Sequence, residues 1–286
     1  MGNAIEVRDL CKKYPGFSLK NVSFALPYGL CCGFVGPNGA GKTTTLKAML
    51  GMIHPEGGEI RLLGREDGDV GVKEELGVML DQPYFQEDWT PLDVERGIRP
   101  FYRAWDSGAY RAYLSRFGLA TDKKFKDFSR GMKMKLAMAV HLSHEAQLLL
   151  LDEPTGGLDP VARDEILDIM REYMVKDGRS ILFSTHITSD LERIADMIVY
   201  ISDGAVSFCG DKDELLGRHC VVRGGRLPAE KRCAAIGLRE YEGGFECLMA
   251  MADIGRLPPD AVCERATIDD CIVYMERQSK SERQGD

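Results

Sequence analysis

One stretch of this sequence constrains the fold more than any other, the segment Gly36-Pro37-Asn38-Gly39-Ala40-Gly41-Lys42-Thr43. It matches the pattern G-x-x-x-x-G-K-[ST] at every fixed position, after the apolar run LCCGFV and before the helix-favouring run TTTLKAML. Glycines let successive backbone N–H groups turn inward around phosphate oxygens, and the following helix adds the positive end of its dipole. A strand, a phosphate-binding loop and a helix in this order predict a nucleoside triphosphate site on an α/β fold.

Two side chains of this loop have expected roles in the site. Lys42 is placed to reach the β- and γ-phosphates, and the Thr43 hydroxyl is placed to ligate Mg²⁺. The alternative, a chance glycine-rich turn, does not explain why the full pattern lies between a strand and a helix. The guanine-specific signature [NT]-K-x-D is absent, because its nearest match, DKDE at 211–214, lacks the asparagine. ATP is therefore favoured over GTP.

A second candidate group lies in LLLLDEP, at 148–154. Four leucines predict a buried strand, whose carboxyl end directs Asp152 and Glu153 to the edge where α/β sheets bind ligands. Asp152 is expected to hold Mg²⁺ directly or through water, and Glu153 to polarise a water for in-line attack on the γ-phosphate. Taken alone, the two acids fit a pair of surface carboxylates equally well. The phosphate-binding loop upstream favours the catalytic interpretation.

The order of strand and helix signals along the rest of the sequence predicts how the chain is divided into domains. Strand and helix signals alternate, which indicates a mostly parallel sheet covered by helices. Residues 84–145 hold both tryptophans and many other aromatic residues, and predict an inserted helical subdomain. The texture changes after Gly217, so we expect a nucleotide-binding domain at 1–217 and a small α/β appendage at 218–286. Within that appendage we expect a helix around AEKRCAAIG, and Thr267 and Asp270 suggest a further helix start.

In order along the chain, these motifs resemble the nucleotide-binding subunit of ATP-binding cassette (ABC) transporters, from about residue 4 to residue 217. The variant signature described below is similar to those of bacterial ABC-2-type exporters. The resemblance implies a P-loop NTPase fold, with a RecA-like mostly parallel sheet, an antiparallel β-subdomain and the inserted helical subdomain. It also implies ATP and Mg²⁺ as ligands.

Four further residues gain roles only from this resemblance. Tyr14 lies where the family keeps an aromatic that stacks on adenine, and Gln82 matches the glutamine that contacts the metal and couples to the membrane partner. Asp159 matches the D-loop, and His186 the switch histidine, which joins Glu153 as a catalytic residue. The implied metal ligands are Thr43, Gln82 and Asp152. The implied ATP-binding residues are Tyr14, Gly36, Pro37, Asn38, Gly39, Ala40, Gly41, Lys42, Thr43, Thr44 and Gln82.

The family signature LSGGQ is altered in this chain. Its place is taken by Ser129, Arg130, Gly131 and Met132, so an arginine replaces the first glycine and a methionine the glutamine. Ser129 and Gly131 still supply a hydroxyl and a closely approaching backbone N–H at a predicted helix N-terminus. In the family this segment contacts the nucleotide held by a second subunit. The effect of the two replacements on turnover stays open at this point.

The resemblance implies a second ABC ATPase subunit, identical or a sister chain, and separate transmembrane permease chains. The net charge of −8 weighs against a nucleic-acid partner. No apolar run approaches the roughly 20 residues that cross a bilayer, and nine cysteines without a CxxC pair suggest reduced thiols. We therefore expect a cytoplasmic protein, peripheral on the inner face of the membrane through the permease. A soluble non-transport ABC ATPase and a non-hydrolysing ATP sensor are the alternatives, and the cargo is not encoded here.

Overall fold

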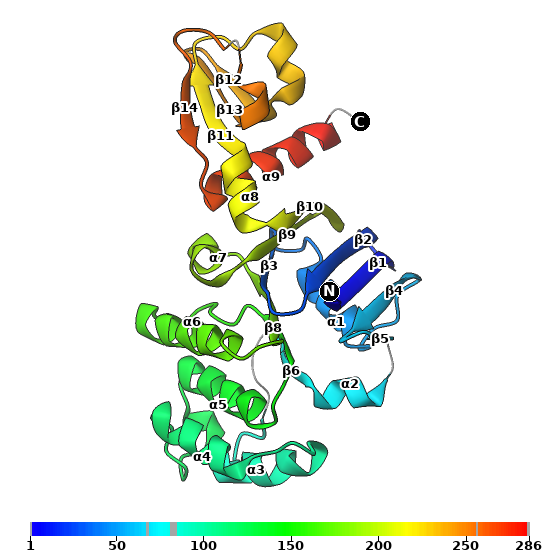
Figure 1. Cartoon of the computed structure of the whole chain (residues 1–286), viewed down its shortest axis with the longest axis vertical. Coiled ribbons are helices and arrows are strands. Elements are labelled where there is room, and N and C mark those ends of the chain that lie inside the picture. The colour runs from blue at the N-terminus through cyan, green and yellow to red at the C-terminus, as the bar shows by residue number, and fades with distance from the viewer. Residues whose placement is uncertain (1, 67–68, 81–84, 256, 285–286) are drawn as a thin grey trace.

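A computed structural model describes residues 2–66, 69–80, 85–255 and 257–284, and its centre is a six-stranded sheet (Figure 1). The strand order is β10-β9-β3-β8-β7-β6; β10 and β9 pair antiparallel, and the other neighbours are parallel. The strands are β3 (Cys31–Val35), β6 (Leu76–Met79), β7 (Leu148–Asp152), β8 (Ser180–Thr185), β9 (Met197–Ser202) and β10 (Ala205–Asp211). The predicted mostly parallel sheet is confirmed.

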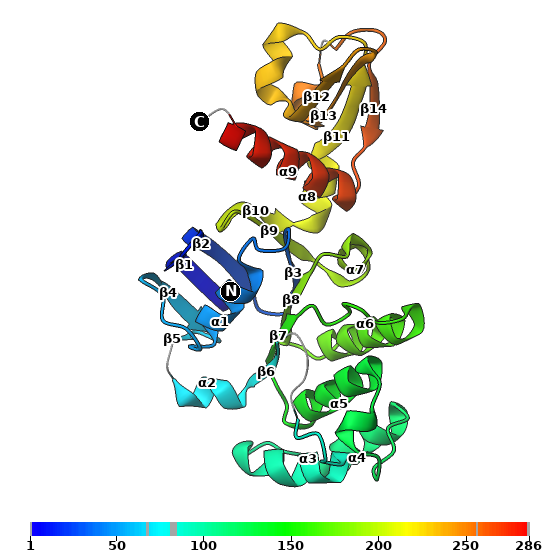
Figure 2. The same cartoon turned by 180° about the vertical axis from the view of Figure 1, so that it is seen from behind.

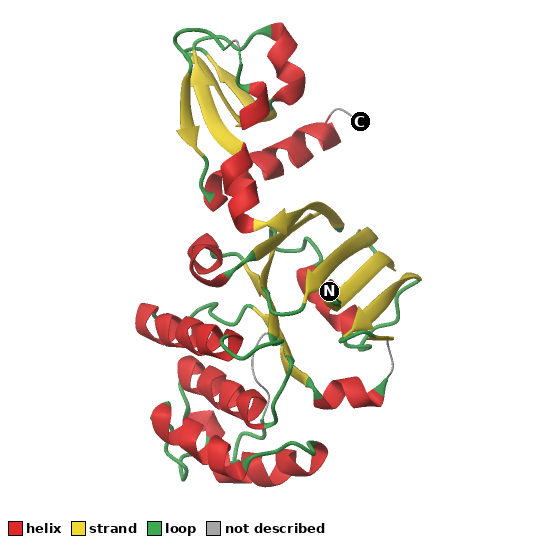
Figure 3. Cartoon of the chain, viewed as in Figure 1, coloured by secondary structure: helices red, strands yellow, loops and turns green. Residues whose placement is uncertain are grey.

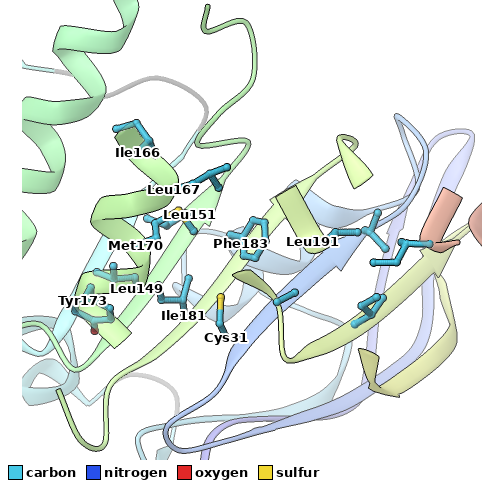
Figure 4. Packing of buried hydrophobic residues seen from close by; sticks show 14 of the residues in the cluster. Cys31, Leu149, Leu151, Ile166, Leu167, Met170, Tyr173, Ile181, Phe183 and Leu191 are labelled. Atoms are coloured by element: carbon cyan, nitrogen blue, oxygen red, sulfur yellow. The ribbon is translucent and has the colours of Figure 1, made fainter. Parts of the chain in front are cut away.

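Both faces of this sheet are covered, because alternate residues of each strand point to opposite sides. Leu149 and Leu151 of β7 join a cluster with helices α5 (Arg130–Ser143), α6 (Pro160–Met174) and α7 (Thr188–Ile194). Figure 4 shows side chains of α6, among them Met170, lying over β7 and β8. Leu148 and Leu150 join a second cluster with helix α1 (Lys42–Met49). Burial on both faces explains the unbroken run of leucines.

An antiparallel sheet lies against the α1 face of the central sheet, as predicted for the β-subdomain (Figure 1). Its order is β2-β1-β4-β5, with β1 (Asn3–Tyr14), β2 (Phe17–Pro27), β4 (Gly57–Leu62) and β5 (Arg65–Glu66). A tight turn joins β1 to β2, and Gly16 at this turn has a φ of +81°, a conformation that glycine adopts without strain. This turn brings Phe17 close to Gly41 of the phosphate-binding loop.

Helices form the end of the molecule that Figure 3 shows without strands. They are α3 (Pro91–Ile98), α4 (Ser107–Arg116) and α5, joined by the 3₁₀ turns η1 (Arg99–Phe101) and η2 (Phe125–Asp127), while the short α2 (Val70–Glu74) precedes β6. Tyr110 is buried and donates its hydroxyl to the carbonyl of Pro91 at 2.9 Å. The predicted helical subdomain is therefore present. Its bounds of 84–145 stay a prediction, since residue 84 lies outside the described residues.

The C-terminal part holds a third, antiparallel sheet with the order β12-β13-β11-β14. Asp270 N–H donates to Thr267 Oγ1 at 3.1 Å, and Thr267 N–H donates to Asp270 Oδ2 at 2.9 Å, so the predicted helix start is confirmed. Its elements are α8 (Lys212–Arg218), β11 (His219–Gly224), η3 (Ala229–Ala234), β12 (Ile236–Tyr241), β13 (Gly244–Ala250), η4 (Met251–Asp253), β14 (Val262–Arg265) and α9 (Ile268–Gln284).

The helix expected around AEKRCAAIG is only the 3₁₀ turn η3. None of its residues is buried, so no apolar face holds an α-helix there, and β12 begins two residues later. Val221 and Tyr274 of this part belong to the same buried cluster as Phe183 of the central sheet. The C-terminal part is thus packed onto the core, and the division at 217/218 stays a prediction.

Candidate nucleotide-binding site

The phosphate-binding loop leaves the carboxyl end of β3 and lies directly against β9. A Cβ atom at Gly36 would come within 2.0 Å of the Ile201 carbonyl oxygen, so only glycine allows this approach. Gly41 has a φ of +112°, which lets the chain turn into α1. The turn between β9 and β10 holds the loop from outside, because Gly204 N–H donates to the Ala40 carbonyl at 3.0 Å. The loop is therefore fixed by backbone contacts.

Lys42 is buried inside the loop that it follows. Its Nζ donates to the carbonyl oxygens of Gly36 at 2.6 Å and Pro37 at 3.1 Å. Burial lowers the pKa of Lys42, and the nearby carboxylates of Glu153 and Asp152 oppose this shift. A cation held in a partly desolvated cradle, with carbonyls as provisional partners, fits an incoming phosphate anion.

Three oxygen-bearing side chains converge beside Lys42. Thr43 Oγ1 donates to Asp152 Oδ2 at 2.7 Å, and Ser184 Oγ donates to Asp152 Oδ1. Asp152 ends β7 and lies opposite Ser184 of β8 in the sheet register, which brings these two side chains together. Hydroxyl and carboxylate oxygens are the ligands that Mg²⁺ prefers, so Thr43 and Asp152 fit the predicted metal site.

Glu153 adopts a conformation that is rare for a residue with a side chain, with a φ of +49°. Its N–H donates to Ser184 Oγ at 2.9 Å, which fixes the backbone at this turn. Its Oε2 lies 2.7 Å from Nδ1 of His186, the residue that follows β8. The structure therefore pairs the predicted catalytic residues, and the imidazole fixes the direction of the carboxylate.

A cavity of about 460 Å³ is lined by Lys42, Thr43, Asp152 and Glu153, whereas Ser184 and His186 lie outside its lining. Sequence reasoning missed Phe17, whose Cζ would lie 3.0 Å from a Cβ at Gly41. The only sequence signal for it was an aromatic residue just after the turn that contains Tyr14, which itself lies outside this cavity. Ala40, a residue of the loop itself, is buried and is also absent from the lining. The lining consists of Gly16, Phe17, Asn38, Gly39, Gly41, Lys42, Thr43, Thr44, Asp152 and Glu153.

The altered signature does not line this cavity. Ser129 caps α5, where its Oγ accepts from Met132 N–H at 3.3 Å, and Asp159 caps α6 in the same way. The Arg130 Nη1 atom lies 2.9 Å from the position of a Cβ at Gly157, so the arginine packs against the D-loop of its own chain. Within the described residues, Arg130 Nε is buried without a hydrogen-bond partner. Gln82 lies outside the described residues, so its roles stay predictions.

A buried ion pair supports the loop that follows Glu153. Asp190 is fully buried, accepts from Thr155 Oγ1 at 2.5 Å, and accepts from Arg163 Nε at 2.7 Å.

We expect Asp190→Ala to lower the free energy of unfolding by about 3 kcal/mol, because it leaves Arg163 without its charge partner. Urea denaturation measures this loss. Asp164→Ala, which removes an exposed partner of Arg193, is the matched control and should cost less than about 1 kcal/mol. If Asp190→Ala and Asp164→Ala lowered the free energy of unfolding equally, the buried ion pair would stabilise the fold no more than the exposed one.

Comparisons with known proteins agree with this geometry. A family model described as "ABC transporter" matches residues 19–156. An uncharacterised ABC transporter ATP-binding protein of Bacillus subtilis is 36% identical over 217 residues, covering 74% of this chain and 72% of the relative. The chain belongs to the ABC transporter family of ATP-binding proteins. It spans 62% to 72% of the lengths of three such relatives.

Other members of the ABC family extend the comparison. The bacitracin transport ATP-binding protein of Enterococcus faecalis is 32% identical over 209 residues, covering 71% of this chain and 68% of the relative. A solved ATP-binding subunit of an ABC transporter superposes with a TM-score of 0.67 at 31% identity, covering 74% of this chain and 91% of that one. A dimeric ATP-binding cassette bound to ADP and phosphate shares the fold, with a TM-score of 0.64 at 23% identity, covering 72% of this chain and 98% of that one.

Proposed function

We propose that this chain binds and hydrolyses ATP as the energy-supplying subunit of an exporter whose permease is a separate chain. One observation carries the proposal: Lys42, the Thr43–Asp152 pair and Glu153 line one cavity, and His186 contacts Glu153 from the end of β8. Membership of the ABC family and the similarity to a bacitracin transport protein support the exporter class. The cargo is set by the permease and is not part of the proposal.

The residues divide the chemistry among them. Lys42 and the N-terminus of α1 neutralise the phosphate charge, and Thr43 and Asp152 would hold Mg²⁺. When bound, Mg²⁺ supplies further positive charge to the phosphate oxygens. Glu153 accepts a proton from the attacking water, and His186 keeps its carboxylate in position through the 2.7 Å contact.

The site of one chain is incomplete in this proposal. Ser129–Met132 does not line the cavity around Lys42, although a hydroxyl and the first N–H groups of α5 make it a suitable anion-binding segment. We propose that a second subunit, identical or a sister chain, supplies this segment across a two-fold junction. The related cassette that forms a dimer with ADP and phosphate supports this arrangement.

The proposed partners are a second ATPase subunit and a permease, without nucleic acid, in keeping with the net charge of −8. In the described part of the chain, no helix has the length and apolar character needed to span a membrane. We propose that the permease holds the subunit at the inner face of the membrane. Gln82 and the segment around it stay our proposed coupling region.

Phosphate release from Mg-ATP tests the proposed activity. The purified chain is assayed alone and with its permease in lipid vesicles, with GTP as the comparison nucleotide. We expect saturable, Mg²⁺-dependent hydrolysis that prefers ATP and rises with the permease. Tight ATP binding without hydrolysis in either preparation would contradict the enzyme and indicate a nucleotide sensor.

A further inference from the structure

A second cavity, of about 710 Å³, adjoins the one around Lys42. The two share Gly16, in the turn between β1 and β2, and Phe17, the first residue of β2. Phe17 packs beside Gly41, which lines the first cavity, and Tyr14 lines the second. The two cavities therefore adjoin at this turn.

The C-terminal helix α9 forms part of the wall of this second cavity through Ser279. The rest of the wall comes from β1 and β2 with the turn between them, including Lys13 and Lys20, and from the hairpin of β9 and β10, including Ser202 and Asp203. Figure 2 shows α9 lying between the third sheet and the strands β9 and β10. A residue far along the sequence thus lies in the same cavity as Tyr14.

Hydrogen bonds fix α9 in this place. On the core side, Glu276 Oε2 accepts from Tyr200 Oη at 2.7 Å and from Ser202 Oγ at 3.2 Å. On the other side, Gln278 Oε1 accepts from Gly237 N–H of β12 at 3.0 Å. Helix α9 therefore joins the third sheet to β9.

Strand β9 also supports the phosphate-binding loop. Ile201 of β9 contacts the loop at Gly36, and the turn after β9 donates Gly204 N–H to Ala40. Glu276 of α9 holds the neighbouring Ser202. Strand β9 therefore connects the C-terminal helix with the floor of the nucleotide site.

The second cavity has the chemistry of a nucleoside site. Tyr14 and Phe17 offer aromatic faces for a base, and Ser202 and Ser279 offer hydroxyls that can donate to or accept from a ribose. Its volume of about 710 Å³ lies in the range of small-molecule pockets. The adjoining phosphate site settles which molecule fits: one with a triphosphate at one end and a nucleoside at the other.

We propose that α9 forms the far wall of the nucleoside end of the nucleotide site, with Ser279 beside the ribose or base of bound ATP. This inference rests on the proposed function as an ATP-binding subunit. It gives the C-terminal part a role in nucleotide binding: the helix closes the site on the side away from the phosphates.

Comparing two ligands distinguishes a role of Ser279 in nucleoside binding from a general loss of structure in its variants. On this proposal Mg-ATP would reach into both cavities, whereas Mg-tripolyphosphate would occupy only the one around Lys42. In the full chain, Ser279→Trp should weaken Mg-ATP binding about tenfold, because the indole occupies the nucleoside space, and should change tripolyphosphate binding less than about twofold. Isothermal titration calorimetry measures both affinities. Ser279→Leu, a smaller change, should give a weaker effect in the same direction and decides the question if the tryptophan variant does not fold.

Ser281→Trp is the matched control. Ser281 is exposed two residues further along α9, which places it about 200° around the helix axis from Ser279, and its substitution should leave both affinities unchanged. Wild-type Mg-ATP affinity in the folded Ser279 variants, or an equal loss for the two ligands, would overturn the inference while leaving the proposed function standing. Failure of the wild-type chain to bind either ligand would instead overturn the proposed function and the inference with it.

Discussion

Replacing Glu153 with glutamine is expected to slow ATP hydrolysis about a thousandfold and to leave Mg-ATP affinity within about threefold of the wild type. The amide keeps the shape of the carboxylate but cannot accept the proton of the attacking water. Lys42, Thr43 and Asp152, which are proposed to bind the phosphates and metal, are untouched. Single-turnover phosphate release measures the rate, and equilibrium titration measures the affinity.

The control for this prediction is Glu145→Gln. Glu145 is a surface carboxylate that pairs with Lys176 and Arg179, away from the cavity, so its neutralisation should leave the hydrolysis rate unchanged. The contact between Glu153 and His186 predicts in addition that His186→Ala lowers the rate without abolishing binding. Hydrolysis by Glu153→Gln at the wild-type rate would show that another group accepts the proton.

Replacing Lys42 with alanine is expected to weaken ATP binding about a hundredfold, because charge-assisted hydrogen bonds to phosphate are lost in a partly desolvated site. The cation is already buried and held by the loop carbonyls of Gly36 and Pro37, so it lies next to the place that a phosphate takes. Calorimetric titration with Mg-ATP measures the loss.

Lys47→Ala on the same helix is the control for this second prediction. Lys47 lies in the last turn of α1, outside the cavity, so its removal should leave the affinity for ATP unchanged. Equal affinities of the Lys42 variant and the wild type would contradict the assignment of the phosphate site. A drop in both variants would point to a non-specific effect of net charge.

The elements nearest the site were the most predictable from sequence, because their signals are local. The run from Leu148 to Leu151 predicted a buried strand, and the pattern at 36–43 predicted a loop between a strand and a helix, which are β3 and α1. Asp203 and Gly204, a residue pair typical of hairpin turns, both have the positive φ that such turns require, +51° and +74°. In each case, the residues that determine the structure are neighbours in the sequence.

The parts that sequence reasoning missed depend on register and on distant packing. Ser184 supports Asp152 and Glu153 only because β8 lies beside β7 in a register that places Ser184 opposite Asp152. Phe17 lines the cavity because the turn before β2 lies against Gly41. Ser279 lies in a cavity with Tyr14, and no local pattern connects residues so far apart in the chain.

The altered signature shows the limit of motif comparison in a different way. The sequence showed that Arg130 and Met132 depart from the family pattern, and the structure shows Arg130 packed against Gly157 of the D-loop. Ser129 is the N-cap of α5, so its hydroxyl lies at the helix N-terminus. This placement is compatible with the anion-binding role that we propose for the segment at the junction between subunits.

The mass of the Glu153→Gln variant in the presence of Mg-ATP tests the proposed junction most directly. Sedimentation at rising concentration should show a species of twice the chain mass with Mg-ATP and a single chain with ADP. In the proposed junction, the γ-phosphate would join Lys42 of one subunit to Ser129 and Gly131 of the other. A species that stays monomeric with Mg-ATP at high concentration, even with a sister subunit and the permease present, would contradict it.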